Sequence, residues 1–193
     1  MTKSPLLDAF NQNNAAFLTY TVGGDPNKET SLEIFREIAR SGADIIECGL
    51  GHGANIGDGG AIQDGTYRAL SNGIKTDDVF DIIKTLRNEF DTNVIIMTYQ
   101  NKIMSYGEDN FLSKCVESKV AGIICVDWPW PLNLNFAAKC KKNNIDFIQL
   151  LCPTTNEERL KLILNDAHDV VYYISMLSTT GQKLKVSPTE IKD

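Results

Sequence analysis

The feature that most constrains the fold of this chain is a regular alternation of short apolar runs with segments of helical period. The apolar runs have strand length and are nearly continuous, which is typical of parallel strands that are covered on both faces. The sequence therefore predicts six strands, at residues 16–22, 43–48, 93–97, 121–126, 147–152 and 170–174.

Between these runs, apolar residues recur at helical spacing, and residues that favour helix starts precede several of the segments. Thr76 is expected to cap a long helix, and the pair Thr155 and Glu158 has the spacing of a capping box. The helical segments are expected around residues 32–39, at 66–70, from 76 to 86, around 111–116 and 136–140, from 155, and from 187.

Strands that each lead into a helix predict parallel pairing through right-handed crossovers. An open doubly wound sheet and a (β/α)₈ barrel both satisfy this pattern, but the first loop, residues 23–26, is a plain turn without a dinucleotide or phosphate fingerprint. We therefore predict an α/β protein with the (β/α)₈ TIM barrel fold. Such a barrel takes roughly 250 residues. Residues 1–193 are accordingly expected to form a single barrel domain that holds strands 1–6 and is truncated before strands 7 and 8, with unpaired edges at strands one and six.

Composition narrows the function classes. The formal net charge is −6, which argues against a nucleic-acid surface. No apolar run approaches the ~20 residues of a membrane helix and no signal peptide is evident, so a cytoplasmic protein without membrane contact is expected. The five cysteines form no CxxC pair, so buried free thiols are expected rather than a metal site.

One carboxylate lies in an unusual place. Glu47 falls inside the apolar run 45–49, and Asp58 follows it on the next loop. A buried carboxyl group at a strand end and a second one on a loop can form an acid–base pair. The alternatives are an ion pair of Glu47 with Lys or Arg, and an ordinary Asp-Gly turn at Asp58. His52 on the same loop is either an acid–base group or incidental, and His168 is expected at the surface.

Several segments resemble the tryptophan synthase alpha subunit family in collinear order. The strongest matches are residues 16–26, 41–49 and 58–63, which contain a Gly-Asp-Pro turn, the sequence GADIIECG and the sequence DGGAIQ. Further agreement comes from residues 97–101, 127–129 and 152–154, and residues 175–181 correspond to the sixth loop of the family.

The resemblance implies a lyase of tryptophan biosynthesis that cleaves indole-3-glycerol phosphate to indole and glyceraldehyde 3-phosphate. It implies an α₂β₂ complex with a beta subunit that carries pyridoxal phosphate, and no cofactor or metal in this chain. By position, Glu47 would be the acid–base group and Asp58 its partner. The implied substrate-binding residues are Tyr20, Tyr99, Tyr172, Thr180 and Gly181.

The loop that carries Asp58 departs from the family pattern. Five glycines between residues 49 and 59, and a sixth at Gly60, occur where the family has prolines and a Ser-Asp pair. Of the family's phosphate-binding residues, only Gly181 is expected here. Two alternatives therefore remain. One is a weakly active or non-catalytic alpha-like subunit that binds and activates a beta subunit, and the other is a different phosphosugar-binding (β/α)₈ enzyme.

Overall fold

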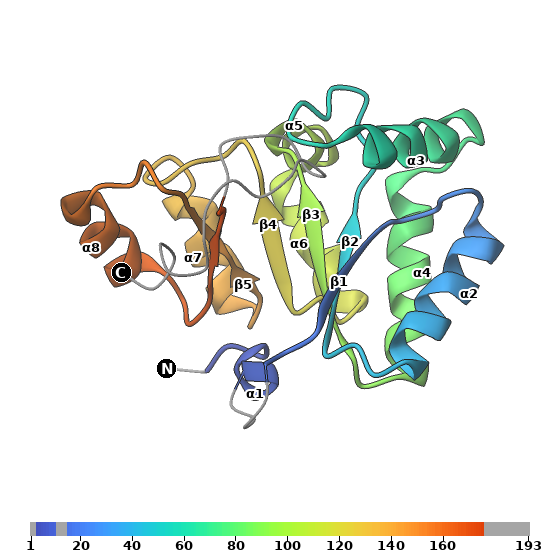
Figure 1. Cartoon of the computed structure of the whole chain (residues 1–193), viewed down its shortest axis with the longest axis horizontal. Helices are drawn as coiled ribbons and strands as arrows, with labels where there is room; N and C mark the ends of the chain where they lie inside the picture. Colours follow the sequence, from blue (N-terminus) through green and yellow to red (C-terminus); the bar gives the residue numbers. More distant parts are fainter. Residues whose placement is uncertain (1–2, 11–14, 176–193) are drawn as a thin grey trace.

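A curved parallel sheet forms the centre of the molecule, with most helices packed along one side of it (Figure 1). The computed structural model describes residues 3–10 and 15–175. Thr180, Gly181 and the expected helix from residue 187 lie outside these residues. The described strands are β1 (Leu18–Val22), β2 (Ile45–Gly49), β3 (Asn93–Thr98), β4 (Gly122–Cys125), β5 (Asp146–Phe147), β6 (Gln149–Leu151) and β7 (Val171–Tyr173).

The order of the strands distinguishes between the two topologies that the sequence allowed. The larger sheet has the order β1-β2-β3-β4-β5, and β6 and β7 form a second pair. Every pair in both sheets is parallel. A doubly wound sheet reverses direction at a switch point, whereas this sheet adds each new strand on the same side. The sequential order is that of a barrel wall, so the predicted fold class is confirmed.

Helices separate these strands. They are α1 (Leu7–Phe10), α2 (Lys28–Arg40), α3 (Gly60–Ser71), α4 (Thr76–Glu89), α5 (Gln100–Tyr106), α6 (Glu108–Glu117), α7 (Leu134–Lys142) and α8 (Glu157–Asp166). Neither α1 nor α5 was expected, and α3 is longer than the predicted segment 66–70.

Two predicted caps were wrong by one residue. The N-cap of α4 is Lys75 rather than Thr76, because the Asp78 carboxylate accepts a hydrogen bond from the Lys75 backbone N–H at 3.0 Å. The N-cap of α8 is Asn156, whose side chain accepts from the Arg159 N–H at 2.9 Å. Thr155 instead accepts from the Cys152 N–H through its hydroxyl, which holds the turn before the helix.

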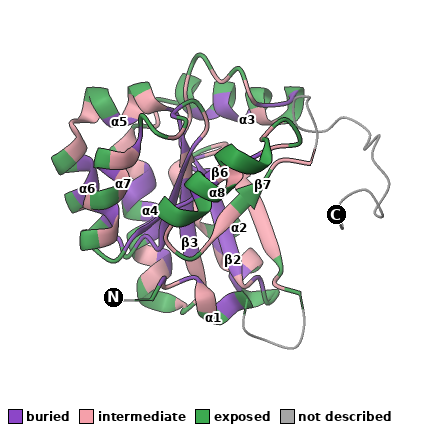
Figure 2. Ribbon diagram, turned by 90° about the vertical axis from the view of Figure 1, so that its left-hand side faces the viewer, coloured by how far each residue is buried: buried purple, intermediate pink, exposed green. Residues whose placement is uncertain are grey.

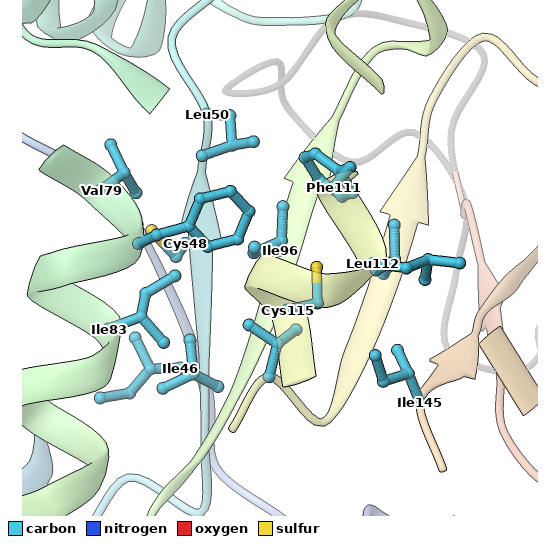
Figure 3. Close-up of a cluster of buried hydrophobic side chains, with 14 of the residues drawn as sticks. Ile46, Cys48, Leu50, Val79, Ile83, Ile96, Phe111, Leu112, Cys115 and Ile145 are labelled. Atoms are coloured by element: carbon cyan, nitrogen blue, oxygen red, sulfur yellow. The ribbon is translucent and has the colours of Figure 1, made fainter. Parts of the chain in front are cut away.

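The two faces of the sheet bury different cores. The outward side chains of β2 and β3, such as Ile46, Cys48 and Ile96, pack against α4 and α6 (Figure 3). The inward side chains of the same strands, Ile45 and Ile95, form a smaller cluster with the N-terminal segment. Figure 2 shows that β2 and β3 are buried while the outer surfaces of the helices are exposed.

The predicted fifth strand, 147–152, is divided between the two sheets. Phe147 pairs with Ile123 of β4, and the Ile148 N–H still donates to the Ile123 carbonyl at 2.9 Å. From Gln149 onward, however, the chain pairs with β7 instead. The buried Gln149 amide exchanges two hydrogen bonds with Asn133, at 3.0 and 3.1 Å, which fixes the chain at the point where it leaves β4. The division of the strand is therefore stabilised by polar side chains, which a pattern of apolar residues does not reveal.

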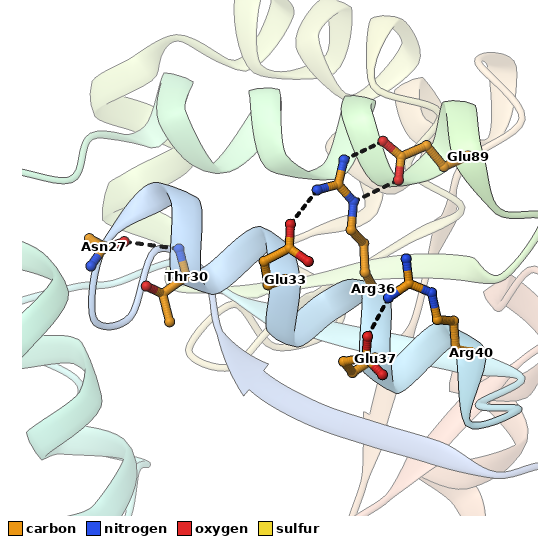
Figure 4. Close-up of polar contacts among 7 residues, drawn as sticks. All are labelled: Asn27, Thr30, Glu33, Arg36, Glu37, Arg40 and Glu89. Atoms are coloured by element: carbon orange, nitrogen blue, oxygen red, sulfur yellow. Dashed lines mark hydrogen bonds and ion pairs between the residues drawn. The ribbon is translucent and has the colours of Figure 1, made fainter.

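Polar contacts outside the sheet hold α2 in place (Figure 4). The Asn27 side chain accepts a hydrogen bond from the Thr30 N–H at 2.9 Å and caps the first turn. Arg36 donates to Glu89 on α4 with its Nε at 2.7 Å and also contacts it through a second nitrogen. The helix that follows β1 is thus tied to the helix that precedes β3. Within residues 3–10 and 15–175, no helix is long and apolar enough to cross a membrane.

Candidate functional site

Glu47 occupies the inner face of β2, at the middle of the strand. It lies opposite Tyr20 in the parallel register of β1 and β2. Glu47 is 5% exposed. Burial raises the pKa of its carboxyl group to about 7, and the charge of Asp58 adds to the shift. The carboxyl group therefore exists in both protonation states near neutral pH, which is the property required of a proton donor and acceptor.

Asp58 lies at the end of the loop between β2 and α3, immediately before the helix N-cap Gly59. Its backbone is fixed on both sides, because its N–H donates to the Asn55 carbonyl at 3.1 Å and its carbonyl accepts from Gln63 Nε2 at 2.8 Å. Burial raises the pKa of the Asp58 carboxyl group, and the nearby Asn55 and Tyr99 side chains oppose that rise. One carboxylate oxygen, Oδ1, is buried without a hydrogen-bond partner among the described residues.

Tyr20 lies beside both carboxyl groups. Burial raises the pKa of its phenol, and the negative charges of Asp58 and Glu47 contribute further. Its ring lies directly over Gly49, since a Cβ added to residue 49 would stand 2.2 Å from the Tyr20 hydroxyl. A glycine at this position therefore makes room for the tyrosine on the inner face.

The other predicted tyrosines also face this region. Tyr172 on β7 is 39% exposed, and its pKa is raised by burial and by the charge of Glu47, so the phenol lies within electrostatic range of that carboxyl group. Tyr99 is only 3% exposed, and burial raises its pKa to about 12. Its hydroxyl accepts a hydrogen bond from the Gly57 N–H at 3.1 Å. The described members of the predicted site come from β1, β2 and β7 and from the segments after β2 and β3, and their side chains lie close enough to influence one another's charge.

The alternative role for Glu47 was an ion pair with Lys or Arg. Asp58 is the charged neighbour that shifts the pKa of Glu47, and within the described part of the chain no Lys or Arg forms an ion pair with Glu47. The same part of the chain contains no cluster of three or more potential metal ligands.

The expectation for His168 was wrong. Its side chain is 5% exposed and lies 3.9 Å from the Asp146 carboxylate and 3.6 Å from that of Asp169. Asp146 itself is fully buried. This cluster lies near the amino ends of β5 and β7, away from Glu47, and sequence spacing gave no sign of it because only the fold brings Asp146 to His168 and Asp169.

Two residues that hold the backbone of Asp58 in place were also not predicted. Asn55 and Gln63 hold the loop around Asp58 through their side chains or backbone. Gln63 lies within the sequence DGGAIQ that marked the family resemblance, so a signal for it existed. Asn55 lies in the part of the loop that departs from the family, where no signal was available.

Comparison with known proteins agrees with this arrangement. The sequence profile of the family described as tryptophan synthase alpha chain matches residues 6–192. The tryptophan synthase alpha chain of Pelagibacter ubique is 55% identical over 177 residues, which is 91% of this chain and 66% of that protein. The corresponding chain of Petrotoga mobilis is 37% identical over 170 residues, which is 88% of this chain and 66% of that protein.

Solved structures give the same result. A tryptophan synthase from Mycobacterium tuberculosis matches with a TM-score of 0.86 at 25% identity, covering 94% of this chain and 72% of that one. A tryptophan synthase α₂β₂ complex from Pyrococcus furiosus matches with a TM-score of 0.81 at 33% identity, covering 98% and 72%. This chain therefore spans just under two thirds of the length of its first two curated relatives. On the extent of the profile match and the identity to these relatives, the chain belongs to the tryptophan synthase alpha chain family.

Proposed function

We propose that this protein catalyses the retro-aldol cleavage of indole-3-glycerol phosphate to indole and glyceraldehyde 3-phosphate. The observation that carries the proposal is the pairing of a deeply buried Glu47, with a pKa of about 7, with Asp58 on the adjoining loop. Two carboxyl groups in different environments can divide proton transfer and charge stabilisation between them.

In the proposed reaction, protonated Glu47 delivers its proton to the indole carbon that bears the glycerol side chain. The carbon–carbon bond then breaks, and the side-chain hydroxyl becomes the aldehyde as its proton is removed. The Glu47 carboxylate takes up that proton and returns to its starting state, so no external acid or base is consumed. Ionised Asp58 accepts a hydrogen bond from the indole N–H, which becomes more acidic as the bond breaks.

The tyrosines would shape the substrate pocket. Tyr20 and Tyr172 flank Glu47 on the inner face, and we assign them to the walls around the indole ring. We also assign substrate contacts to Tyr99, Thr180 and Gly181, the last two by family position alone. No metal or organic cofactor takes part in the proposed steps on this chain.

The proposed partner is a beta subunit that carries pyridoxal phosphate and receives the indole, in an α₂β₂ complex. The description of the Pyrococcus furiosus relative as such a complex supports this assignment. The proposed setting is the cytoplasm, with no role in nucleic-acid or membrane binding.

The test is the release of indole from indole-3-glycerol phosphate by the full chain, measured alone and with a beta subunit. We expect Glu47→Gln and Asp58→Asn each to lower kcat by about 10²–10⁴-fold, the typical value of a positioned acid or base. Asp64→Asn, on the exposed side of α3, is the matched control and should retain wild-type release. Release that is unchanged in Glu47→Gln would exclude the proposed chemistry.

A second candidate is a subunit that activates its partner without catalysis of its own. The glycine-rich loop favours it, since each proline replaced by glycine raises the entropy of the open loop and costs about 0.4–1 kcal/mol. This reading requires that the wild-type chain releases no indole and still increases the activity of an added beta subunit.

A further inference from the structure

The loop between β2 and α3 is attached to one buried side chain. Tyr99 follows β3 and is the N-cap residue of α5, so its backbone is held by two elements. With 3% of its surface exposed, its ring has little freedom to move. The loop of residues 50–59, in contrast, has no regular structure and contains several glycines. A rigid residue of this kind can limit the positions that an irregular loop adopts.

The first attachment is a hydrogen bond at close range. The Gly57 N–H donates to the Tyr99 hydroxyl at 3.1 Å. A Cβ added to residue 57 would lie 3.3 Å from that hydroxyl oxygen and 3.2 Å from Val126 Cγ1. The loop thus lies directly against Tyr99 and Val126 at the residue before Asp58, and a side chain there would push the loop outward.

The second attachment is a ring contact. The His52 imidazole contacts the Tyr99 ring in a tilted arrangement, with 5.3 Å between ring centroids and 35° between ring planes. This distance is within the range of favourable aromatic pairs. The loop therefore contacts the same side chain near its beginning, at His52, and near its end, at Gly57.

These contacts bear on Asp58 because it follows Gly57 directly and because the Tyr99 side chain lies close enough to influence its carboxyl group. We propose that His52 and Tyr99 are positioning residues that close the glycine-rich loop and present Asp58 to the substrate. The inference rests on the proposed function in one respect only, the catalytic role of Asp58.

The structural part of the proposal is tested by hydrogen exchange of the loop peptide, residues 51–59, in the full chain. The variants are His52→Ala, which removes the ring, His52→Phe, which keeps it, and Tyr99→Phe, which removes only the hydroxyl. Ile56→Ala is the matched control, since Ile56 belongs to the same loop and is 78% exposed. We expect exchange to become at least 3-fold faster in His52→Ala and Tyr99→Phe and to stay at the wild-type rate in the other two variants.

The catalytic part is tested by kinetics of indole release. We expect kcat to fall about 5- to 20-fold in His52→Ala with a KM within 2-fold of wild type, because the loop is misplaced in the transition state, and His52→Phe to restore kcat. If His52→Phe is as slow as His52→Ala while its loop exchanges at the wild-type rate, His52 acts through its imidazole and the positioning role is overturned.

The two parts fail separately. Unchanged exchange in both His52→Ala and Tyr99→Phe overturns the inference whatever the activity. Absence of indole release from the wild-type chain overturns the proposed function, while the exchange rates still decide whether His52 and Tyr99 hold the loop. Circular dichroism and thermal melting identify any variant that loses its fold, and Tyr99→Phe retains the buried ring for that reason.

Discussion

Glu47 carries its proton to unusually high pH because burial and the charge of Asp58 both oppose ionisation. Each effect acts only in the folded chain. In the unfolded chain the same group has its ordinary pKa of 4.5. The difference affects stability as well as catalysis, because the two states then bind different numbers of protons.

The pH dependence of stability follows from this difference. Between pH 4.5 and about 7 the folded state holds a proton that the unfolded state has released, so the contribution of Glu47 to stability falls as pH rises through this window. Glu47→Gln removes that dependence. We expect the free energy of unfolding of the variant, relative to wild type, to rise by about 1–3 kcal/mol from pH 4.5 to pH 8, since one pKa unit corresponds to about 1.4 kcal/mol. Urea unfolding at both pH values measures it, and a constant difference would contradict the raised pKa.

The contact between Tyr20 and Gly49 gives a second prediction. In Gly49→Ala the new Cβ would stand 2.2 Å from the Tyr20 hydroxyl, so the ring must move. We expect a loss of about 1–3 kcal/mol of stability, typical of overpacking. Tyr20→Leu removes the clashing atoms, so the double variant should be less destabilised than the sum of the single variants. Strict additivity in chemical denaturation would show that the two residues are not in contact.

The residues of the site differ in how far sequence could predict them. The position of Glu47 inside an apolar run was itself a signal, and the structure brings Tyr20, Asp58 and Tyr172 to the same place. Their catalytic and binding roles remain predictions. The ring contact between His52 and Tyr99 and the burial of the His168 side chain could not be predicted, because they depend on distances between segments that are remote in sequence.

At the scale of single elements, the start of α2 depends on one side chain. The Asn27 oxygen accepts from the Thr30 N–H at 2.9 Å, which satisfies one of the unpaired donors of the first turn. Asn27→Ala should lower the free energy of unfolding by about 1 kcal/mol, and Asn27→Asp should retain most of it. Thermal denaturation of the three proteins compares them. Equal loss in both variants would mean that the side-chain hydrogen bond does not stabilise the helix.

Apolar periodicity predicted most elements well and failed where polar groups or turns decide the boundary. The division of the fifth strand depends on Gln149 and Asn133, and the N-cap of α5 is Tyr99, which is buried and contacts the loop of residues 50–59. Neither has a pattern that repeats along the chain. At α8 the cap was displaced because Thr155 and Asn156 both offer acceptors to nearby backbone donors, and at α4 because Asp78 accepts from the Lys75 N–H.

For the whole molecule, the open edges of the two sheets are the main consequence of the topology. Among the described residues, β1 pairs only with β2 and β7 pairs only with β6. Unpaired strand edges are templates for pairing with another chain. We propose that both sheets belong to one barrel domain, in which β1 and β7 are the outer strands of the described part.

The open edges predict self-association. Residues 1–193 expressed by themselves should form oligomers at a concentration of about 10–100 μM, which is typical of transiently exposed edges. Tyr173 on β7 is 47% exposed. Tyr173→Lys should reduce the oligomer fraction, because a charge on an edge strand disfavours pairing. Size-exclusion chromatography with light scattering measures both. A monodisperse wild-type monomer with a sharp thermal transition would contradict the prediction.

Four of the five cysteines are buried in the core and one is partly exposed, although the sequence predicted all of them to be buried. Cys48, Cys115, Cys125 and Cys140 all lie in the core between the sheet and its helices. Cys152, after β6, is partly exposed, and hydrogen bonds from Thr154 and Thr155 lower the pKa of its thiol.

Because of this division, the reaction of the buried thiols with a reagent reports how often the core becomes exposed to solvent. A thiol reagent should modify one cysteine per native chain quickly, and each further modification then measures how often the helical layer separates from the strands beneath it. Among the described residues, the four buried thiols lie in the core between the sheet and its helices, not on the inner face with Glu47. The labelling rate would therefore distinguish breathing of the supporting layer from movement of the loop over the site, two motions that activity measurements alone combine.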